Sequence, residues 1–270
     1  MHPIDHQTVL VTGGTDGLGR ALAADLAARG ATVLVHGRDD ERGAATLAEI
    51  RAATPAARLH WYRADLGSLD QVRGLADTVL RDHPRLHALV NNAGIGATVP
   101  GGGARQTSAD GHELRFAVNY LAGYLLAELL LPALRAAAPA RIVNVSSLGQ
   151  EAIDFDDVML TRNYGGVRAY CQSKLAQILH TVDLAERLAD SGVTANALHP
   201  ATYMPTKIVP TPMSSLDEGV RATARLVVDA GLDDVSGRFF DGVRPGRPHD
   251  QAADPDARAR LRALSAALTE

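Results

Sequence analysis

The chain has 270 residues and a mass of 28.5 kDa, enough for one large domain or two small ones that fold without disulfides. Its 46% hydrophobic and 21% charged residues exclude an intrinsically disordered protein. A net charge of −4 argues against a partner such as nucleic acid or an anionic membrane. The single cysteine excludes an internal disulfide and favours the cytoplasm.

The N-terminus does not have the pattern of a signal peptide, because it is short, polar and contains Pro3. The longest apolar stretch runs from Phe116 to Leu134 and is interrupted by Asn119, Glu128 and Pro132. A membrane span needs about 20 residues with few or no charges, so this stretch predicts a buried core helix.

Short apolar runs alternate with segments whose apolar residues recur at helical spacing, as in Leu18, Leu22 and Leu26. The predicted strands are Thr8–Val11, Thr32–His36, Arg58–Tyr62, Ala88–Asn91, Arg141–Val145 and Thr194–Leu198, with a seventh near Arg238–Phe240. Two long helices are expected at Asp110–Ala138 and Arg168–Ser191, and a last one near Asp254–Leu268. The alternation predicts a single α/β domain over 1–270, a doubly wound parallel sheet of about seven strands with helices on both faces.

A glycine-rich segment, residues 12–19, joins the first predicted strand to the first helix. Gly13 permits a tight turn, Gly17 lets the backbone approach a pyrophosphate, and Gly19 allows close packing of the helix on the sheet. The helix N-terminus offers free N–H groups and a partial positive charge to phosphates. The segment therefore predicts a dinucleotide site with contacts from Gly13, Thr15, Asp16, Gly17, Leu18 and Gly19.

This spacing resembles the short-chain dehydrogenase/reductase family. Further family motifs follow in order: Asp65-Leu66, Asn91-Asn92-Ala93-Gly94, Ser146-Ser147 and Tyr170-x-x-x-Lys174. The resemblance covers essentially the whole chain. It implies a Rossmann-type fold, a nicotinamide cofactor and hydride transfer.

The end of the second strand bears on the choice of cofactor. Family members that use NAD place an aspartate where this chain has Gly37, and Arg38 follows. A guanidinium fork suits a 2′-phosphate, so NADP(H) is favoured over NAD(H). The alternative is that Arg38 is solvated and Asp39 binds the ribose, although Asp39 is also a good N-cap for the next helix. The glycine loop adds no second basic residue, since Thr15 and Asp16 stand there.

The resemblance assigns further residues to the cofactor. Asp65 would accept a hydrogen bond from the adenine amino group, or it would only cap the following turn. The other expected contacts are Leu66, Asn92, Ala93, Gly94, Pro200 and Thr202. Ala201 replaces the family's glycine, which leaves open whether Thr202 or Thr206 meets the nicotinamide carboxamide.

Tyr170 and Lys174 lie one helical turn apart and share a helix face. A free tyrosine has a pKa of about 10 and is a poor proton shuttle at neutral pH, but a nearby ammonium lowers that pKa. The resemblance implies that Tyr170 donates the proton and that both residues contact the cofactor. It also implies that Ser146 orients the substrate oxygen and that Asn119 completes a proton relay through water. Ser147 is the rival serine, and a purely structural Asn119 is the alternative.

The segment from Ser146 to Tyr170 is about twice the family's usual length, so we expect a substrate-side insertion at about 148–169. The stretch from Phe155 onward resembles the retinol-dehydrogenase-like branch, which acts on lipophilic alcohols and carbonyls with NADP(H). A lid is expected at about 201–214. The predicted pocket wall is Leu148, Gln150, Tyr203 and Met204.

Together these features predict a cytoplasmic oxidoreductase that transfers a hydride between NADP(H) and an alcohol or carbonyl. Two alternatives are a non-catalytic NADP(H) sensor and an enone C=C reductase on the same fold. The His, Cys, Asp and Glu residues do not show metal-ligand spacing, so no metal is predicted. The family favours a homodimer or homotetramer through the two long helices, which the insertion could block.

Overall fold

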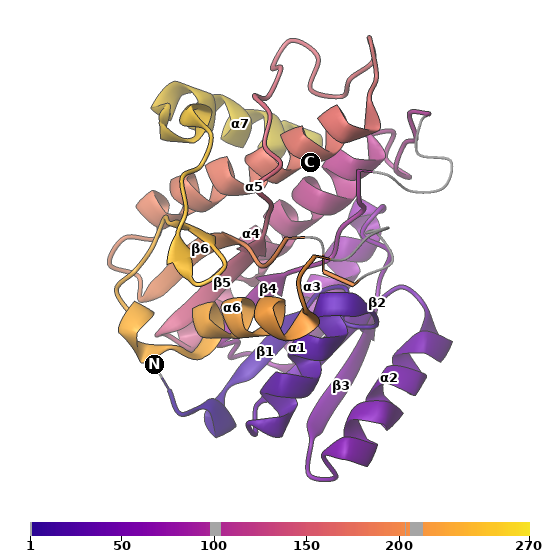
Figure 1. Cartoon of the computed structure of the whole chain (residues 1–270), viewed down its shortest axis with the longest axis vertical. Helices are drawn as coiled ribbons and strands as arrows, with labels where there is room; N and C mark the ends of the chain where they lie inside the picture. The colour runs from indigo at the N-terminus through magenta and orange to yellow at the C-terminus, as the bar shows by residue number, and fades with distance from the viewer. Residues whose placement is uncertain (1, 98–103, 203, 206–212) are drawn as a thin grey trace.

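A computed structural model describes residues 2–97, 104–202, 204–205 and 213–270. Its sheet has eight strands in the order β3-β2-β1-β4-β5-β6-β7-β8 (Figure 1). β1 to β7 pair in parallel, and β8 is antiparallel to β7. The strands are β1 Thr8–Val11, β2 Thr32–Gly37, β3 Arg58–Arg63, β4 Ala88–Asn91, β5 Ala140–Val145, β6 Val193–His199, β7 Phe239–Asp241 and β8 Arg244–Pro245.

The predicted α/β fold class is confirmed. Strands β1 to β6 lie within one or two residues of their predicted bounds. Their apolar runs are typical of strands covered on both faces. β8 was not predicted, because a two-residue strand is too short to show any periodicity.

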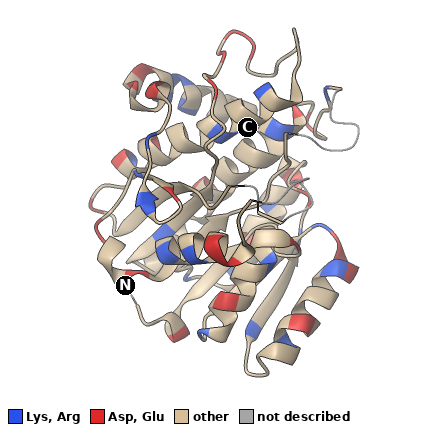
Figure 2. Cartoon of the chain, viewed as in Figure 1, with Lys and Arg blue, Asp and Glu red and all other residues tan. Residues whose placement is uncertain are grey.

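Helices cover both faces of the sheet. The helices are η1 Ile4–His6, α1 Gly17–Ala28, α2 Asp40–Ala53, α3 Leu69–Asp82, η2 Phe116–Leu121, α4 Ala122–Ala136, α5 Gly166–Arg187, α6 Leu216–Val228, η3 Ala230–Leu232, η4 Asp250–Ala253 and α7 Pro255–Leu268. Apolar side chains of α1, α2 and α6 form one core layer, and those of α3, α4, α5 and α7 form the other. Acidic and basic residues are interspersed along the helices in Figure 2.

The helix predicted over Asp110–Ala138 begins later, at Phe116, and ends at Ala136. Thr107 and Glu113 instead form an isolated antiparallel bridge, and the helix proper follows as the π-helical turn η2 and then α4. The cause is hydrogen bonding before the helix: Ser108 pairs with His112 through the backbone, and Asp110 accepts a bond from the distant Leu69 N–H. Such side-chain and turn contacts compete with helix formation.

One described helical segment, Phe116–Ala136, is long and apolar enough to cross a bilayer by length and composition. Within the structure, 72% of its most apolar window is buried. It packs in the core layer with α3 and α5, as its interruptions by polar residues predicted.

Candidate active site

A cavity of about 1070 Å³ opens at the carboxyl ends of the strands, where the strand order reverses between β1 and β4. Open α/β sheets bind ligands at this crevice. All the predicted cofactor residues line it: Gly13, Thr15, Asp16, Gly17, Leu18, Gly19, Arg38, Asp65, Leu66, Asn92, Ala93, Gly94, Tyr170, Lys174, Pro200 and Thr202. Segments far apart in sequence therefore meet at one site.

The glycine loop is held in the geometry that its glycines permit. Gly13 has a φ of 66°, in the left-handed region that favours glycine. A Cβ atom on Gly19 would lie 2.3 Å from the Gly13 carbonyl oxygen, so only glycine allows α1 to start this close to the loop. Asn92 Nδ2 donates to the Thr12 carbonyl at 2.8 Å, which fixes the loop against the end of β4.

His36 at the end of β2 also supports this loop. Its Nδ1 accepts a hydrogen bond from the Gly13 N–H at 3.2 Å, and its Nε2 donates to the Ala64 carbonyl at 3.1 Å. Burial lowers the pKa of His36 to about 4, so the ring is neutral at pH 7 and Nδ1 remains an acceptor. The sequence analysis did not single out this residue, because nothing local links it to the loop.

Two arginines face the cavity near the glycine loop. Arg38 lines it as predicted, and Arg42 from the first turn of α2 lines it too. An Arg42 guanidinium nitrogen lies 3.1 Å from Asp16 Oδ2. Asp39 accepts a bond from the Arg42 N–H at 3.0 Å, so its predicted role as N-cap is confirmed. An N-cap at Asp39 places Arg42 in the first turn of α2, so the sequence contained a signal for a second basic residue near the glycine loop.

Ser146, Tyr170 and Lys174 come together at the end of β5. Ser146 Oγ donates to the Lys174 carbonyl at 2.7 Å, and Lys174 Nζ lies 5.7 Å from the centre of the Tyr170 ring. Lys174 Nζ also donates to the Val145 carbonyl at 2.8 Å and to Gln177 Oε1 at 3.1 Å. Burial lowers the pKa of Lys174 to about 7, so it exchanges its proton near neutral pH.

Asn119 lies in η2, behind the cavity wall. Its Oδ1 accepts from the Ile95 N–H at 2.7 Å, and its Nδ2 donates to the Ile95 carbonyl and to Ser173 Oγ. A Cβ atom on Gly94 would lie 3.3 Å from Asn119 Oδ1 and 3.6 Å from Lys174 Nζ. Asn119 thus supports the loop that separates it from Lys174. A π-helical turn at this point is typical of functional sites.

Asp65 lines the cavity while its Oδ1 accepts the Gly67 N–H at 2.9 Å. The turn-capping role is therefore present in the structure, and α3 itself is capped by Ser68.

The substrate side agrees with only part of the prediction. Leu148 and Met204 line the cavity, but Gln150 does not: its amide bonds the Ser147 carbonyl and the His249 N–H. Tyr203, and Thr206 with much of the expected lid, fall outside the described residues.

Two cavity-lining residues on α5 were not predicted, Val167 and Cys171. Cys171 follows Tyr170 directly on α5. Burial raises the pKa of the Cys171 thiol, which argues against a thiolate nucleophile.

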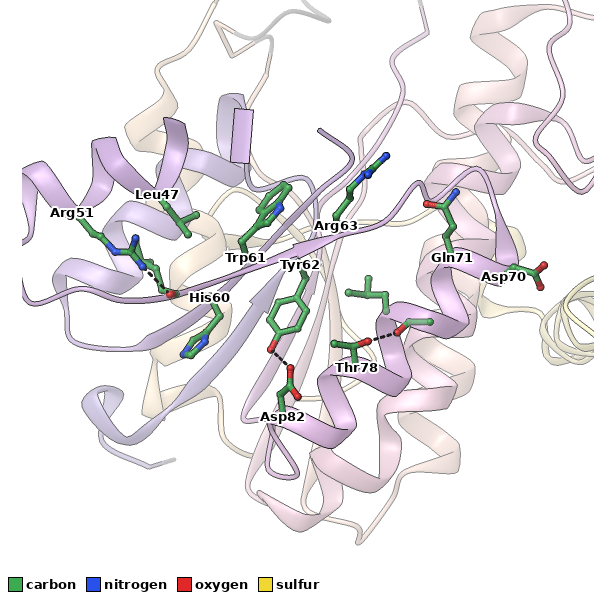
Figure 3. A pocket seen from close by; sticks show the side chains of 13 residues that line it. Leu47, Arg51, His60, Trp61, Tyr62, Arg63, Asp70, Gln71, Thr78 and Asp82 are labelled. Atoms are coloured by element: carbon green, nitrogen blue, oxygen red, sulfur yellow. Dashed lines mark hydrogen bonds between the residues drawn. The ribbon is translucent and has the colours of Figure 1, made fainter. Parts of the chain in front are cut away.

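A second cavity of about 790 Å³ follows the free edge of β3 between α2 and α3 (Figure 3). Its polar groups pair with one another: Tyr62 donates to Asp82 at 3.3 Å, and Arg51 donates to the Leu59 carbonyl at 3.2 Å. Burial raises the pKa of Tyr62 to about 12, so it is a poor proton donor. Arg51 covers an edge carbonyl, a common protection of edge strands.

The glycine cradle and the serine, tyrosine and lysine set define a Rossmann-type oxidoreductase class. The family model for short chain dehydrogenases matches residues 7–214. The chain belongs to this family, whose members bind a nicotinamide cofactor.

Individual relatives narrow the assignment to the retinol-dehydrogenase-like branch. Retinol dehydrogenase 13 of Homo sapiens is 38% identical over 98% of this chain and 85% of that protein. A crystal structure of an uncharacterized protein from Mycobacterium Paratuberculosis has a TM-score of 0.80 at 34% identity, covering 98% of this chain and 93% of that one. The Pseudomonas aeruginosa RhlG/NADP active-site complex has a TM-score of 0.71 at 25% identity, covering 89% and 97%.

Proposed function

We propose that the protein is an NADP(H)-dependent oxidoreductase that interconverts an alcohol and its aldehyde or ketone. The observation that carries this proposal is the meeting of Ser146, Tyr170 and Lys174 with the glycine cradle in one cavity. The residues fit a nicotinamide dinucleotide, because Gly13 and Gly19 leave no room for a Cβ and the first turn of α1 lines the cavity, where helix N–H groups suit a phosphate. Such a cofactor, when bound, supplies or accepts the hydride.

The polar residues of the cavity would transfer the proton and orient the substrate oxygen. In the direction of reduction, Tyr170 donates its phenolic proton to the substrate oxygen. The ammonium of Lys174 favours the tyrosinate that remains, and its proton is exchangeable near neutral pH. Ser146, at the end of β5, orients the same oxygen. Asn119 holds the loop beside Lys174 and supports a route for proton return.

Three observations support NADP(H) over NAD(H). Arg38 and Arg42 both line the cavity near the glycine loop, and a guanidinium fork suits a 2′-phosphate. Asp39, the rival ligand for a free ribose, is engaged as the N-cap of α2. The RhlG relative is described as a complex with NADP.

A lipophilic substrate fits the cavity mouth. Leu148 and Val167 are 49% and 57% exposed there, which is high for large apolar side chains. The names of the retinol dehydrogenase relatives agree with such a substrate. We therefore propose a primary or secondary alcohol with an apolar tail, or its carbonyl. A cytoplasmic location stays a prediction from the single cysteine.

The test is turnover on a panel of apolar aldehydes, ketones and alcohols, followed by NADPH absorbance. Tyr170→Phe should lower kcat by about 10²–10⁴-fold, because it removes the proton donor, with the Kd for NADPH nearly unchanged. Tyr62→Phe is the matched control, since it also removes one tyrosine hydroxyl but at the β3 edge, in the other cavity.

Retained turnover by Tyr170→Phe would contradict the assigned role. NADPH binding by the wild type without turnover of any panel member would favour the sensor. An enone in the panel tests the alternative of a C=C reductase. Reduction of the C=C bond yields a saturated ketone, whereas reduction of the C=O bond yields an allylic alcohol.

A further inference from the structure

Behind the wall of the active-site cavity lies a buried arginine with two backbone partners. Arg115 is 1% exposed; its Nε donates to the Gly96 carbonyl at 2.9 Å, and a terminal nitrogen donates to the Ala97 carbonyl at 3.3 Å. Asn119, one turn further on, holds both backbone groups of Ile95. Two side chains of one helical segment thus hold three consecutive residues, 95–97, which all line the cavity.

The same arginine reaches the end of the long segment before α5. Its other terminal nitrogen donates to Tyr164 Oη at 2.7 Å, and Tyr164 Oη donates to Glu113 Oε1 at 3.0 Å. Glu113 is 1% exposed, and its Oε2 accepts the Phe116 N–H at 2.7 Å. The tyrosine hydroxyl therefore bridges a buried ion pair whose charged atoms are 3.9 Å apart.

This bridge connects two walls of the cavity. Tyr164 directly precedes Gly165, the N-cap of α5, and Val167 in the first turn of α5 lines the cavity. Gly96 and Ala97 line it from the β4–α4 loop. A buried ion pair contributes little net stability compared with apolar packing, but its directed bonds restrict geometry. In this structure the bonds of Arg115 and Tyr164 limit the distance between residues 96–97 and the start of α5.

We propose that Glu113, Arg115 and Tyr164 are positioning residues that set the width of the substrate-side entrance between residues 95–97 and the N-terminus of α5. The inference rests on the proposed function, because it assigns these residues to the fit of the alcohol or carbonyl. Their bonds join one another and the backbone of Gly96, Ala97 and Phe116. Their effect is on substrate fit and not on proton transfer.

The test variant is Tyr164→Phe, which removes only the bridging hydroxyl and keeps the ring. The KM of an apolar carbonyl substrate should rise about tenfold, because loss of one charge-assisted bond loosens the entrance, while kcat and the Kd for NADPH stay within about twofold. Hydrogen exchange of the protein without cofactor should quicken at the amides of residues 95–97 and 164–168. Tyr62→Phe again serves as the control for loss of a tyrosine–carboxylate bond.

A KM for Tyr164→Phe no higher than that of Tyr62→Phe would overturn the proposal, as would unchanged exchange at residues 95–97. Arg115→Lys, which keeps the charge but not the fork, should reproduce the KM increase if it folds. Absence of turnover by the wild type would overturn the proposed function alone. The hydrogen-exchange comparison would still test whether the Glu113–Arg115–Tyr164 contacts connect residues 95–97 to the start of α5, because it needs no catalysis.

Discussion

Asp16 places a carboxylate at the N-terminus of α1, where a cofactor phosphate is expected. It caps the helix by accepting the Gly17 N–H at 2.9 Å, and its other oxygen pairs with Arg42 at 3.1 Å. The pairing offsets a negative charge that would otherwise repel a phosphate. Removing Arg42 therefore has two effects: it takes away a cation near the predicted 2′-phosphate and leaves Asp16 uncompensated.

For this reason Arg42→Ala should raise the KM for NADPH about tenfold and leave the KM for NADH within about threefold. Steady-state kinetics with the two cofactors measure the difference. Arg20→Ala is the matched control, because Arg20 also joins α1 to α2 through an exposed ion pair, with Glu49 at 2.8 Å. An equal rise in KM for both cofactors would show that Arg42 does not read the 2′-phosphate.

At the scale of elements, an aromatic and polar cluster joins η2, α4 and α5. The His180 ring lies 5.1 Å from the Tyr124 ring and 6.2 Å from the Tyr120 ring. Burial lowers the pKa of His180 to about 4 and raises the pKa of Tyr124. The cluster is therefore built around a neutral histidine.

This burial predicts an acid-dependent loss of stability. Between pH 6.5 and 4 the unfolded chain binds a proton at His180 and the folded chain does not, so the free energy of unfolding falls as the pH falls through that window. Replacing His180 with Phe keeps the ring and removes the proton site. Between pH 7.5 and pH 5 the wild type should lose about 2 kcal/mol more than His180→Phe in urea unfolding. Equal losses would contradict the assignment.

At the scale of the whole molecule, α7 covers much of α5 (Figure 1). Leu261 of α7 is buried in the same core layer as α5, Arg258 pairs with Glu186 at 2.8 Å, and Ser265 Oγ bonds Tyr120 Oη at 2.7 Å. One of the two long helices through which the family favours assembly, α5, is therefore already packed against a helix of the same chain.

We accordingly expect a monomer in place of the homodimer or homotetramer that the resemblance suggested. Light scattering coupled to size exclusion should give a mass near the chain's 28.5 kDa at micromolar concentration. A species of twice that mass, broken by a charge introduced on α5 but not by one on α2, would contradict this expectation. The blocking element would be α7 and not the insertion at about 148–169.

Local patterns predicted most of the framework, and they failed where hydrogen bonds that leave no periodicity in the sequence decide the structure. The start of α4 was misplaced because bonds of Ser108 and Asp110 within a turn are not visible as periodicity. Gln150 was assigned to the pocket by its position after β5, yet its amide is used by Ser147 and His249. A partner 99 positions away decides where that side chain points.

Sequence patterns alone predicted the order of strands and helices along the chain, the glycine cradle and the spacing of Tyr170 from Lys174. Each of these depends on intervals of a few residues, over which backbone geometry is nearly fixed. Three contacts are visible only in the folded structure: the ion pair of Arg42 with Asp16, the bridge of Tyr164 between Arg115 and Glu113, and the packing of α7 on α5. These contacts join residues from separate elements, and their pairing depends on how the helices pack on the sheet.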